Sequence, residues 1–233
     1  MICTYCENIL SSLSMQERSV YDFILFESEH FVATPTIGSL VKGWVLIISK
    51  QHCVCMGAIA KELYEELEQF KNFVGAAVKE CYGPIAIFEH GPAYAKQAVG
   101  CGVDHAHIHI MPTDEDLVRG LQDLMKEELD WDEVTGICDT HSVHTSGREY
   151  LYIEQPAGFA RLVAGRGFGS QLFRRVIAHH LEMPEKYDWK QHYWVDNARQ
   201  TVDRMTRWRD HNEPCGHPYR SALRHEYHER RAK

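Results

Sequence analysis

The sequence predicts an α+β fold, in which an antiparallel sheet is crossed by one long helix and followed by a C-terminal α/β extension. Three patterns predict it: histidines alternating with small or apolar residues over 104–112, several short strand-like runs within 20–50, and an amphipathic helix over 57–80. The pattern changes beyond the histidines. We therefore divide the chain into a core domain, residues 1–113, and an extension, residues 114–233, that packs on it.

The stretch 104–112 contains His105, His107 and His109 at a strict spacing of two. On a β-strand all three rings share one face, about 6.6 Å from one to the next, because the chain rises about 3.3 Å per residue. A helix is a poor alternative, since residues two apart on a helix do not face each other. The opposite face of the strand, which we expect to pack into the core, carries Ala106, Ile108 and Ile110.

These histidines have three interpretations. A half-buried strand that happens to carry polar side chains is the plainest, but three histidines in register argue against it. A metal site and a nucleophile remain, because imidazole serves both roles near neutral pH. The two roles do not exclude each other.

The composition is that of a globular protein, with 44% apolar and 25% charged residues among 233. A formal charge of −8 argues against a general nucleic-acid binder, so we expect no stable nucleic-acid partner. A phosphate-bearing substrate then needs a local cluster of Arg, Lys or helix N-termini. No apolar run approaches the ~20 residues that span a bilayer, and the N-terminus lacks the pattern of a signal peptide. We expect a cytoplasmic protein without membrane contact.

Cys3 and Cys6 form a Cys-x-x-Cys knuckle, which supplies half of a tetrahedral zinc site. A redox pair is one alternative, but such a pair usually follows a strand in a βαβ unit. Two unrelated buried thiols are another.

The first strands are expected at 20–26, 31–34 and 44–49, in an antiparallel meander punctuated by glycines. His52 follows directly after the last of them. A single histidine at such a place is usually a solvated loop residue, so any metal role for His52 depends on its context.

The helix over 57–80 is expected to end at Gly83 and Pro84 and to lead into a strand over 85–89. The loop over 90–102 is rich in glycine. Its glycines permit close approach of backbone amides to a ligand, although a plain irregular loop fits the pattern equally well.

Beyond residue 113 we expect a helix capped by Asp114, a loop over 138–148, two strands, and two further helices. The strands are expected at 149–154 and 159–163, and the helices after Ser170 and near 197–208. The histidine-rich tail matches no metal spacing, and we leave it unassigned.

The third helix has Ser170 as its expected N-cap, followed by Gln171, Arg174 and Arg175. A helix N-terminus with arginines in its first turns can hold an anion. An ordinary capped helix with solvated arginines is the alternative. If these side chains bind substrate, replacing either arginine by alanine should weaken turnover or substrate affinity and leave folding intact.

The chain resembles the histidine-triad superfamily of nucleotide hydrolases and transferases. The segment 105–111 alternates histidine and apolar residues as that family does, and 43–52 looks like its segment of glycine, strand, lysine and histidine. The resemblance covers roughly residues 1–113. The rest resembles only loosely the extensions of larger members, such as dinucleoside-polyphosphate phosphorylases.

The resemblance implies a role for each matching residue. His107 is the family's nucleophile, and His109 helps to bind and polarise the phosphate. Gly102, with Cys101, stands where many members have a glutamine or serine near the phosphates. Thr36 stands near the acidic position that often holds the ribose. In zinc-bearing members a closed structural site would be formed by Cys3, Cys6, His52 and His105.

The implied function is hydrolysis of a dinucleoside polyphosphate or nucleoside phosphoramidate through a nucleotidyl-histidine intermediate. One alternative is a nucleotidyltransferase or phosphorylase that passes the nucleotidyl group to phosphate or a sugar phosphate. Another is a zinc-stabilised nucleotide-binding protein without turnover. The expected partner is a nucleotide or nucleotide derivative, and a homodimer is a compatible assembly.

Overall fold

The chain folds around one eight-stranded antiparallel sheet with the strand order β1-β2-β3-β5-β4-β7-β8-β6. The structure is a computed structural model that describes residues 3–10, 19–100, 102–156, 158–165, 167–212 and 219. The strands are β1 (Phe26–Glu27), β2 (Phe31–Pro35), β3 (Val45–Ser49), β4 (Ile85–Gly91), β5 (His107–Pro112), β6 (Asp132–Val134), β7 (Glu149–Glu154) and β8 (Ala160–Gly165).

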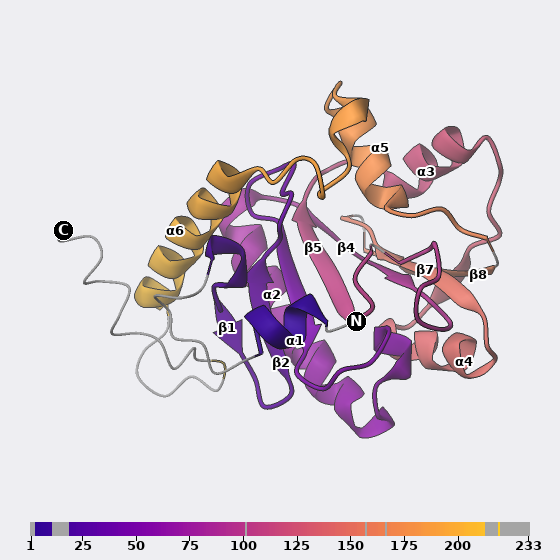
Figure 1. Cartoon of the computed structure of the whole chain (residues 1–233), viewed down its shortest axis with the longest axis horizontal. Helices are drawn as coiled ribbons and strands as arrows, with labels where there is room; N and C mark the ends of the chain where they lie inside the picture. The colour runs from indigo at the N-terminus through magenta and orange to yellow at the C-terminus, as the bar shows by residue number, and fades with distance from the viewer. Residues whose placement is uncertain are drawn as a thin grey trace.

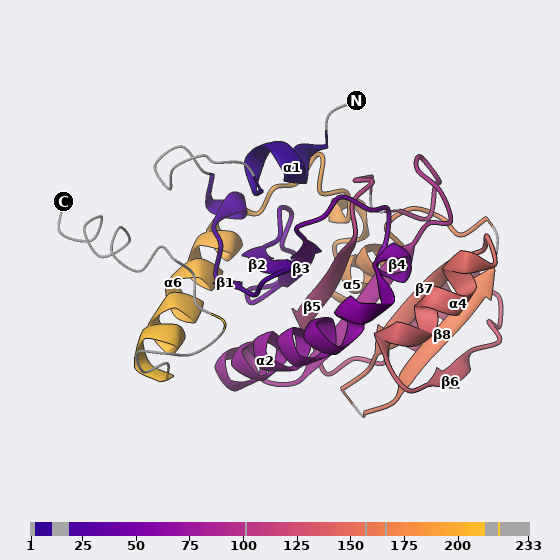
Figure 2. The same cartoon turned by 90° about the horizontal axis from the view of Figure 1, so that it is seen from below.

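Helices cover both faces of this sheet. Figure 2 shows α2 on one side and α1 on the other, and Figure 1 shows α6 and α4 toward opposite ends. The α-helices are α1 (Thr4–Asn8), α2 (Tyr64–Tyr82), α3 (Leu117–Met125), α4 (Thr140–Thr145), α5 (Leu172–His180) and α6 (Val195–Asn212). Short 3-10 turns are η1 (Val20–Asp22), η2 (Met56–Ala58), η3 (Lys61–Leu63), η4 (Ile137–Asp139) and η5 (Pro184–Lys186).

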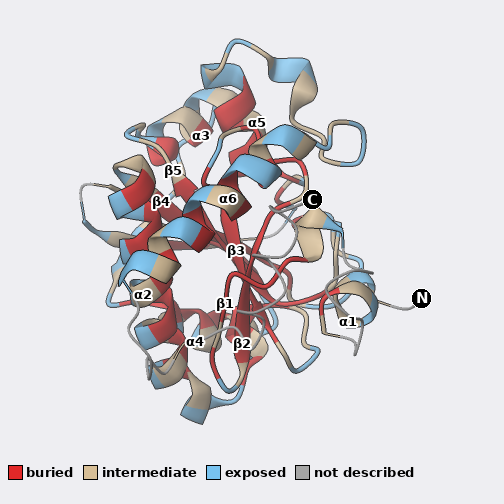
Figure 3. Cartoon of the chain, turned by 90° about the vertical axis from the view of Figure 1, so that its left-hand side faces the viewer, coloured by how far each residue is buried: buried red, intermediate tan, exposed pale blue. Residues whose placement is uncertain are grey.

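The larger core lies between the sheet and α2, α4 and α6. It includes the apolar face of β5, which the alternating pattern predicted, and side chains of α2 such as Leu67, Phe70 and Val74. Val202 and Met205 of α6 join the same core. Figure 3 shows the buried strands between helices whose outer faces are exposed.

The opposite face of the sheet carries two smaller apolar clusters. One packs α3 and α5 against Trp44, Phe88 and Met111. The other packs Ile9, next to α1, against Leu46 and Ile48 of β3. The histidine side chains of β5 emerge on this same face, because His109 is paired with Leu46 and His107 with Ile48.

The predicted fold class is confirmed: the sheet is antiparallel, and α2 packs against it over 19 residues. The three strands of the C-terminal half, β6, β7 and β8, join the same sheet through the pairing of β7 with β4. The boundary at residue 113 stays a prediction.

Four local predictions outside the site were wrong. The expected strand over 20–26 begins instead with the turn η1, whose N-cap Ser19 donates from Oγ to Asp22 Oδ2 at 2.6 Å, and only Phe26 belongs to β1. The long helix begins at Tyr64, because η2 and η3 occupy its expected first turns. The expected loop over 138–148 contains α4. The cap of α3 is Asp116, whose side chain accepts from Arg119 N at 3.0 Å, and not Asp114.

Among the described residues, no helix combines the length and the apolar character that a membrane crossing requires. The predicted cytoplasmic location and the homodimer stay predictions. The cysteine and histidines of the tail beyond residue 212 lie outside the described residues.

Candidate active site and metal centre

His107 is held by the backbone of its own strand. Its Nδ1 lies 2.6 Å from the carbonyl oxygen of His105, and that oxygen can only accept a hydrogen bond. Nδ1 therefore carries the hydrogen, and Nε2 keeps its lone pair. Burial lowers the pKa of His107 to about 4, an effect that the hydrogen bond to His105 partly offsets. The ring is neutral near pH 7.

His109 is clamped between aromatic side chains. The indole Nε1 of Trp44 lies 3.1 Å from His109 Nδ1, and the Phe88 ring stacks on the imidazole at 4.7 Å with an interplanar angle of 14°. Burial lowers the pKa of His109 well below its ordinary value, with the neighbouring His107, His90 and Arg174 acting in the same direction. The centroids of the His107 and His109 rings are 5.0 Å apart.

The two histidines line a pocket of about 120 Å³ on the face of the sheet that carries α1. Its wall combines apolar side chains with a few polar groups and one arginine, Arg174, which is 1% exposed. The remaining lining residues are Thr4, Tyr5, Asn8, Ile9, Ser19, Tyr21, Asp22, Thr34, Pro35, Thr36, Ile37, Leu46, Val103 and Trp189.

Arg174, on α5, ties the C-terminal half of the chain to this pocket. Its Nε donates to Tyr187 O at 2.9 Å and its Nη2 to Gly38 O at 2.5 Å, while the guanidinium lies 4.9 Å from the centre of the Trp44 ring. Gly38 has φ +72°, and a Cβ atom at this position would lie 2.5 Å from Trp189 Cβ. Only glycine permits this approach, so the segment around Trp189 packs directly on the loop after β2.

The other predicted binding residues lie outside the pocket lining. Gly102 is exposed, and Lys190 Nζ lies 2.9 Å from where a Gly102 side chain would begin. Ser170 Oγ donates to Gly100 O at 3.1 Å, and Ser170 does not occupy the N-cap position of α5. That position belongs to Gln171, whose Nε2 donates to Asp188 at 3.2 Å. Arg175 packs on the Tyr187 ring at 5.6 Å.

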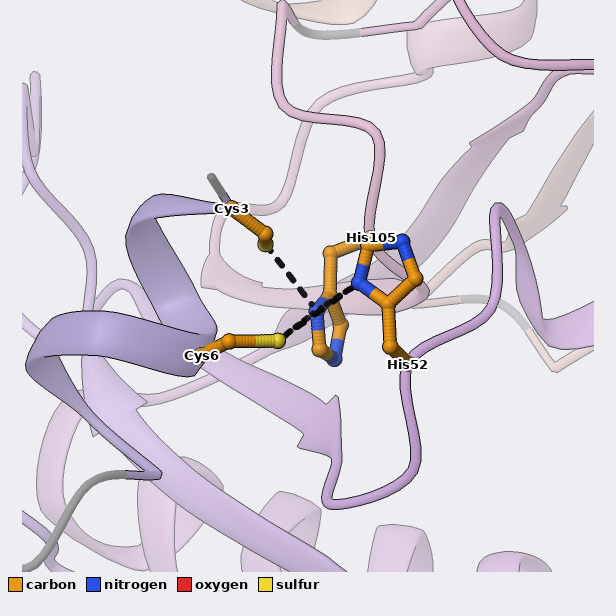
Figure 4. A group of neighbouring side chains, drawn as sticks. All are labelled: Cys3, Cys6, His52 and His105. Carbon is orange, nitrogen blue, oxygen red and sulfur yellow. Dashed lines mark hydrogen bonds between the residues drawn. The ribbon is translucent and has the colours of Figure 1, made fainter. Parts of the chain in front are cut away.

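Cys3, Cys6, His52 and His105 point toward one another, as Figure 4 shows, and Thr4 and Tyr5, which lie between the two cysteines in the sequence, line the pocket. Cys3 Sγ lies 3.2 Å from His105 Nδ1, and Cys6 Sγ lies 3.5 Å from His52 Nδ1 and 3.6 Å from His105 Nδ1. The two Nδ1 atoms are 3.2 Å apart, and the four ligand atoms all lie within 4.8 Å of one another. The two cysteines come from α1 and its N-cap, and the histidines from the ends of two loops.

The donor set and spacing fit a zinc ion. With Zn–S of about 2.3 Å and Zn–N of about 2.0 Å, a tetrahedron places its ligand atoms roughly 3.3 to 3.8 Å apart. The remaining nitrogen of His105, Nε2, lies 2.7 Å from Ser49 O, so it carries the hydrogen and leaves Nδ1 free to ligate. Burial lowers the pKa of His105, which favours the neutral ring that a metal needs. This cluster can bind a metal ion.

A family model described as "protein similar to CwfJ C-terminal" matches residues 3–125, which is more than half of the 233 residues. The chain belongs to this family. All four candidate metal ligands, His107 and His109 lie within the residues that match the CwfJ C-terminal family, whereas Arg174 lies outside them.

One curated relative of this CwfJ-like chain is the zinc finger CCCH domain-containing protein 64 of Arabidopsis thaliana, 27% identical over 208 residues. The match covers 81% of this chain and 31% of the length of that relative.

Two solved structures are similar. A hypothetical histidine triad nucleotide-binding protein of Sulfolobus tokodaii strain 7 is 23% identical, and the match covers 40% of this chain and 62% of that protein, with a TM-score of 0.35. Yeast Ap4A phosphorylase Apa2, in complex with AMP, is 12% identical. The match covers 69% of this chain and 70% of that protein, also with a TM-score of 0.35. Similarities this low carry no argument about activity.

Sequence reasoning missed three residues of the site. Trp44 was assigned only to a strand, yet pairing that strand with β5 would have placed it on the face of His109. Tyr5 lies between the two cysteines, and its ring contacts both His105 and His107, at 5.7 and 5.6 Å. Trp189 reaches the pocket through a contact far away in sequence, for which the sequence has no local signal.

Proposed function

We propose that this CwfJ-like chain breaks a phosphoanhydride or phosphoramidate bond of a nucleotide derivative through a nucleotidyl-histidine intermediate on His107. One observation carries the proposal: the hydrogen bond from His107 Nδ1 to His105 O, 2.6 Å long, leaves the Nε2 lone pair available in a pocket shared with Arg174. A fixed nitrogen lone pair beside a buried cation suits attack on an anionic phosphorus centre.

In the first step, the Nε2 lone pair of His107 forms a bond to the α-phosphorus. The bond from phosphorus to the leaving oxygen or nitrogen breaks, and its electron pair departs with the leaving group, which takes up a proton from solvent. The phosphorylated imidazole gains a positive charge, which the His105 carbonyl stabilises through Nδ1–H. Arg174 and the His109 ring stabilise the negative charge on the phosphoryl oxygens.

In the second step, an acceptor oxygen attacks the same phosphorus. The bond between phosphorus and Nε2 breaks, its electron pair returns to His107, and the acceptor loses its proton to solvent. Water as acceptor makes the protein a hydrolase, whereas phosphate or a sugar phosphate makes it a transferase. We propose the hydrolase, because the acceptor then needs no binding site of its own.

We further propose that a zinc ion held by Cys3, Cys6, His52 and His105 is structural. Four protein ligands complete a tetrahedron and leave no open position for a reactive water. A bound ion would fix His105, and through the His105 carbonyl the orientation of His107. No chemical step requires it.

The test replaces His107 by asparagine, which keeps a polar amide but has no nucleophilic ring nitrogen. We expect turnover of nucleotide derivatives to fall by roughly 10³-fold or more, because no other group can form the intermediate. The control is His180→Asn on α5, an exposed histidine that contacts Glu115 at 3.1 Å and should keep full activity.

A second measurement looks for the intermediate itself. Wild-type protein mixed with substrate and quenched at alkaline pH, where phosphoramidates survive, should show a nucleotide adduct by mass spectrometry on the peptide that contains His107. A fully active His107→Asn variant, or an adduct on another histidine, would overturn the mechanism. The same reactions with added phosphate or sugar phosphate identify the acceptor.

A further inference from the structure

We propose that Trp44 is a positioning residue, whose indole N–H fixes His109 as the tautomer with hydrogen on Nε2, opposite to the tautomer of His107. This inference rests on the proposed function for its consequence, but the tautomer can be measured without any activity. In this tautomer His109 can donate a hydrogen bond to phosphate from Nε2. The neighbouring His107 keeps a lone pair on its own Nε2 for attack on phosphorus.

The indole N–H of Trp44 determines which nitrogen of His109 carries hydrogen. Trp Nε1–H donates and never accepts, so the 3.1 Å contact with His109 requires Nδ1 to be the acceptor. A ring nitrogen that accepts carries no hydrogen. A neutral His109 must therefore carry its hydrogen on Nε2.

His107 has the reverse arrangement, because its partner is a carbonyl rather than an N–H group. The backbone oxygen of His105 accepts from Nδ1, which leaves Nε2 bare. Two histidines two residues apart on one strand are thus set in opposite tautomers by two different partners. A nucleophile and a phosphate hydrogen-bond donor need this pairing of a lone pair with an N–H group.

Several contacts hold the indole and the imidazole in place. Trp44 is fully buried, with Arg174 over its ring at 4.9 Å. Phe88 stacks on His109 from the neighbouring strand, where the two residues are paired, so a ring flip of His109 would have to break this stack. A flipped His109 ring would turn Cδ2–H toward the indole, and a C–H group accepts no hydrogen bond, so the atom that faces the indole is Nδ1.

The first test measures the tautomer directly. Protein labelled with ¹⁵N in its histidine rings, examined by long-range ¹H–¹⁵N NMR, should show His109 with a bare Nδ1 and a protonated Nε2. His109→Gln identifies the signals. A wild-type spectrum with the hydrogen on Nδ1 of His109 would overturn the inference, whether or not the protein turns over nucleotides.

The second test separates the N–H group from the bulk of the indole. Trp44→Phe keeps a large ring but has no N–H. Trp44→His is smaller, yet its Nε2–H can occupy the place of the indole N–H, because the two five-membered rings superpose. We expect Trp44→Phe to lose the single tautomer and to lower kcat about 10- to 100-fold with little change in KM.

Trp44→His should keep most of the wild-type kcat and the wild-type tautomer, although its lost bulk should give it the lower melting temperature. A merely structural role predicts the reverse order, with the histidine variant the less active. Trp208→Phe, on α6 and packed on Phe26 and Phe73, controls for the loss of a half-buried indole and should change neither property. Unchanged kcat and tautomer in Trp44→Phe would overturn the proposal. If no nucleotide derivative is turned over at all, the proposed function fails while the tautomer result stands.

Discussion

At the scale of single residues, Arg174 both lines the pocket and stabilises the fold. Its guanidinium lines the pocket, donates to two backbone carbonyls, Tyr187 O and Gly38 O, and stacks on Trp44. The sequence alone predicts that Arg174→Ala leaves folding intact. The structure predicts a loss of stability instead, because removal of the side chain leaves two buried carbonyl oxygens without their hydrogen-bond donor.

We predict that Arg174→Gln lowers the free energy of unfolding by about 3 kcal/mol, through lost charge-assisted hydrogen bonds, and also raises KM for a nucleotide substrate. Chemical denaturation and steady-state kinetics measure the two effects. The matched control is Arg175→Gln, since Arg175 is only half-buried and packs on the Tyr187 ring. Equal effects in both variants would contradict the special role of Arg174.

Glu89 is a buried acid within β4 that joins two parts of the fold. Its carboxylate accepts from Met56 N at 2.6 Å and from Tyr150 Oη at 2.5 Å. Burial raises the pKa of Glu89 to about 7, although both hydrogen bonds act to lower it. The titratable groups that face it are Cys53, Cys55, Tyr64 and Tyr150.

This pKa predicts a pH dependence of stability. Because the pKa in the folded state lies above the unfolded value of about 4.3, the protonated form favours folding. The contribution of Glu89 is complete below about pH 4.3 and is lost as the pH rises through 7. Glu89→Gln imitates the protonated acid, so relative to wild type it should be more stable at pH 8, by about 3 kcal/mol, and similar at pH 4. Chemical denaturation at each pH measures the two free energies of unfolding. A difference between the two proteins that is the same at pH 4 and pH 8 would refute the prediction.

Residues of the site differed in how far the sequence could predict them. The spacing of the three histidines and of Cys3 and Cys6 is local, and the structure brings the four predicted ligands together. Trp189 reaches the site only because α5 and the chain after it fold back over the loop that follows β2. Such contacts join residues more than 80 positions apart, and no local pattern encodes them.

At the scale of elements, α1 is a helix of five residues that cannot be stable alone. It is anchored by the apolar contacts of Tyr5 and Ile9 with β3 and neighbouring residues, and by the cysteine pair beside His52 and His105. A bound zinc ion would hold α1 over the pocket, where Tyr5 contacts the rings of His105 and His107.

We therefore predict one zinc per chain and a loss of stability without it. Zinc at about 1,000 times its Kd adds about 4 kcal/mol, which for a chain of this size corresponds to roughly 10 °C in Tm. Cys6→Ser should lose the metal and this stability, as measured by metal analysis and thermal unfolding. Cys138→Ser, at an exposed cysteine, should lose neither. Wild-type protein that is metal-free and insensitive to chelators would exclude the site.

The elements that the sequence predicted well are those whose periodicity agrees with their tertiary surroundings. The apolar alternation of β5 and the spacing in α2 survive because both pack in one core. The run over 20–26 has the composition of a strand, yet the local bond between Ser19 and Asp22 makes a turn of its first half. Local capping overrides β-propensity there.

At the scale of the whole molecule, the sheet is continuous across the predicted boundary. β7 pairs with β4 along five residues of each strand. From the C-terminal half, α6 also returns to the N-terminal core, where Thr201 Oγ1 accepts from Gly43 N at 2.8 Å and Arg209 donates to Leu25 O at 3.2 Å. The two halves therefore share their backbone pairing and their core.

We predict that the whole chain unfolds in one cooperative transition. Tryptophan fluorescence and far-UV circular dichroism followed in urea should give the same midpoint, since the shared sheet couples both halves. Two separated transitions would instead support independent units on either side of residue 113.

The metal cluster also has a consequence for how the chain reaches this fold. Its ligands are far apart in sequence, with 46 positions between Cys6 and His52 and 53 between His52 and His105. To bring all four ligands together, an unfolded chain would have to close two long loops, and each closure would cost about 4 kcal/mol of conformational freedom. The complete site can form only once β3 and β5 have paired and the N-terminal segment has returned to them. Zinc uptake during refolding would thus report how far the sheet has assembled. A complex of zinc with Cys3 and Cys6 alone would form early, and binding by all four ligands would come last.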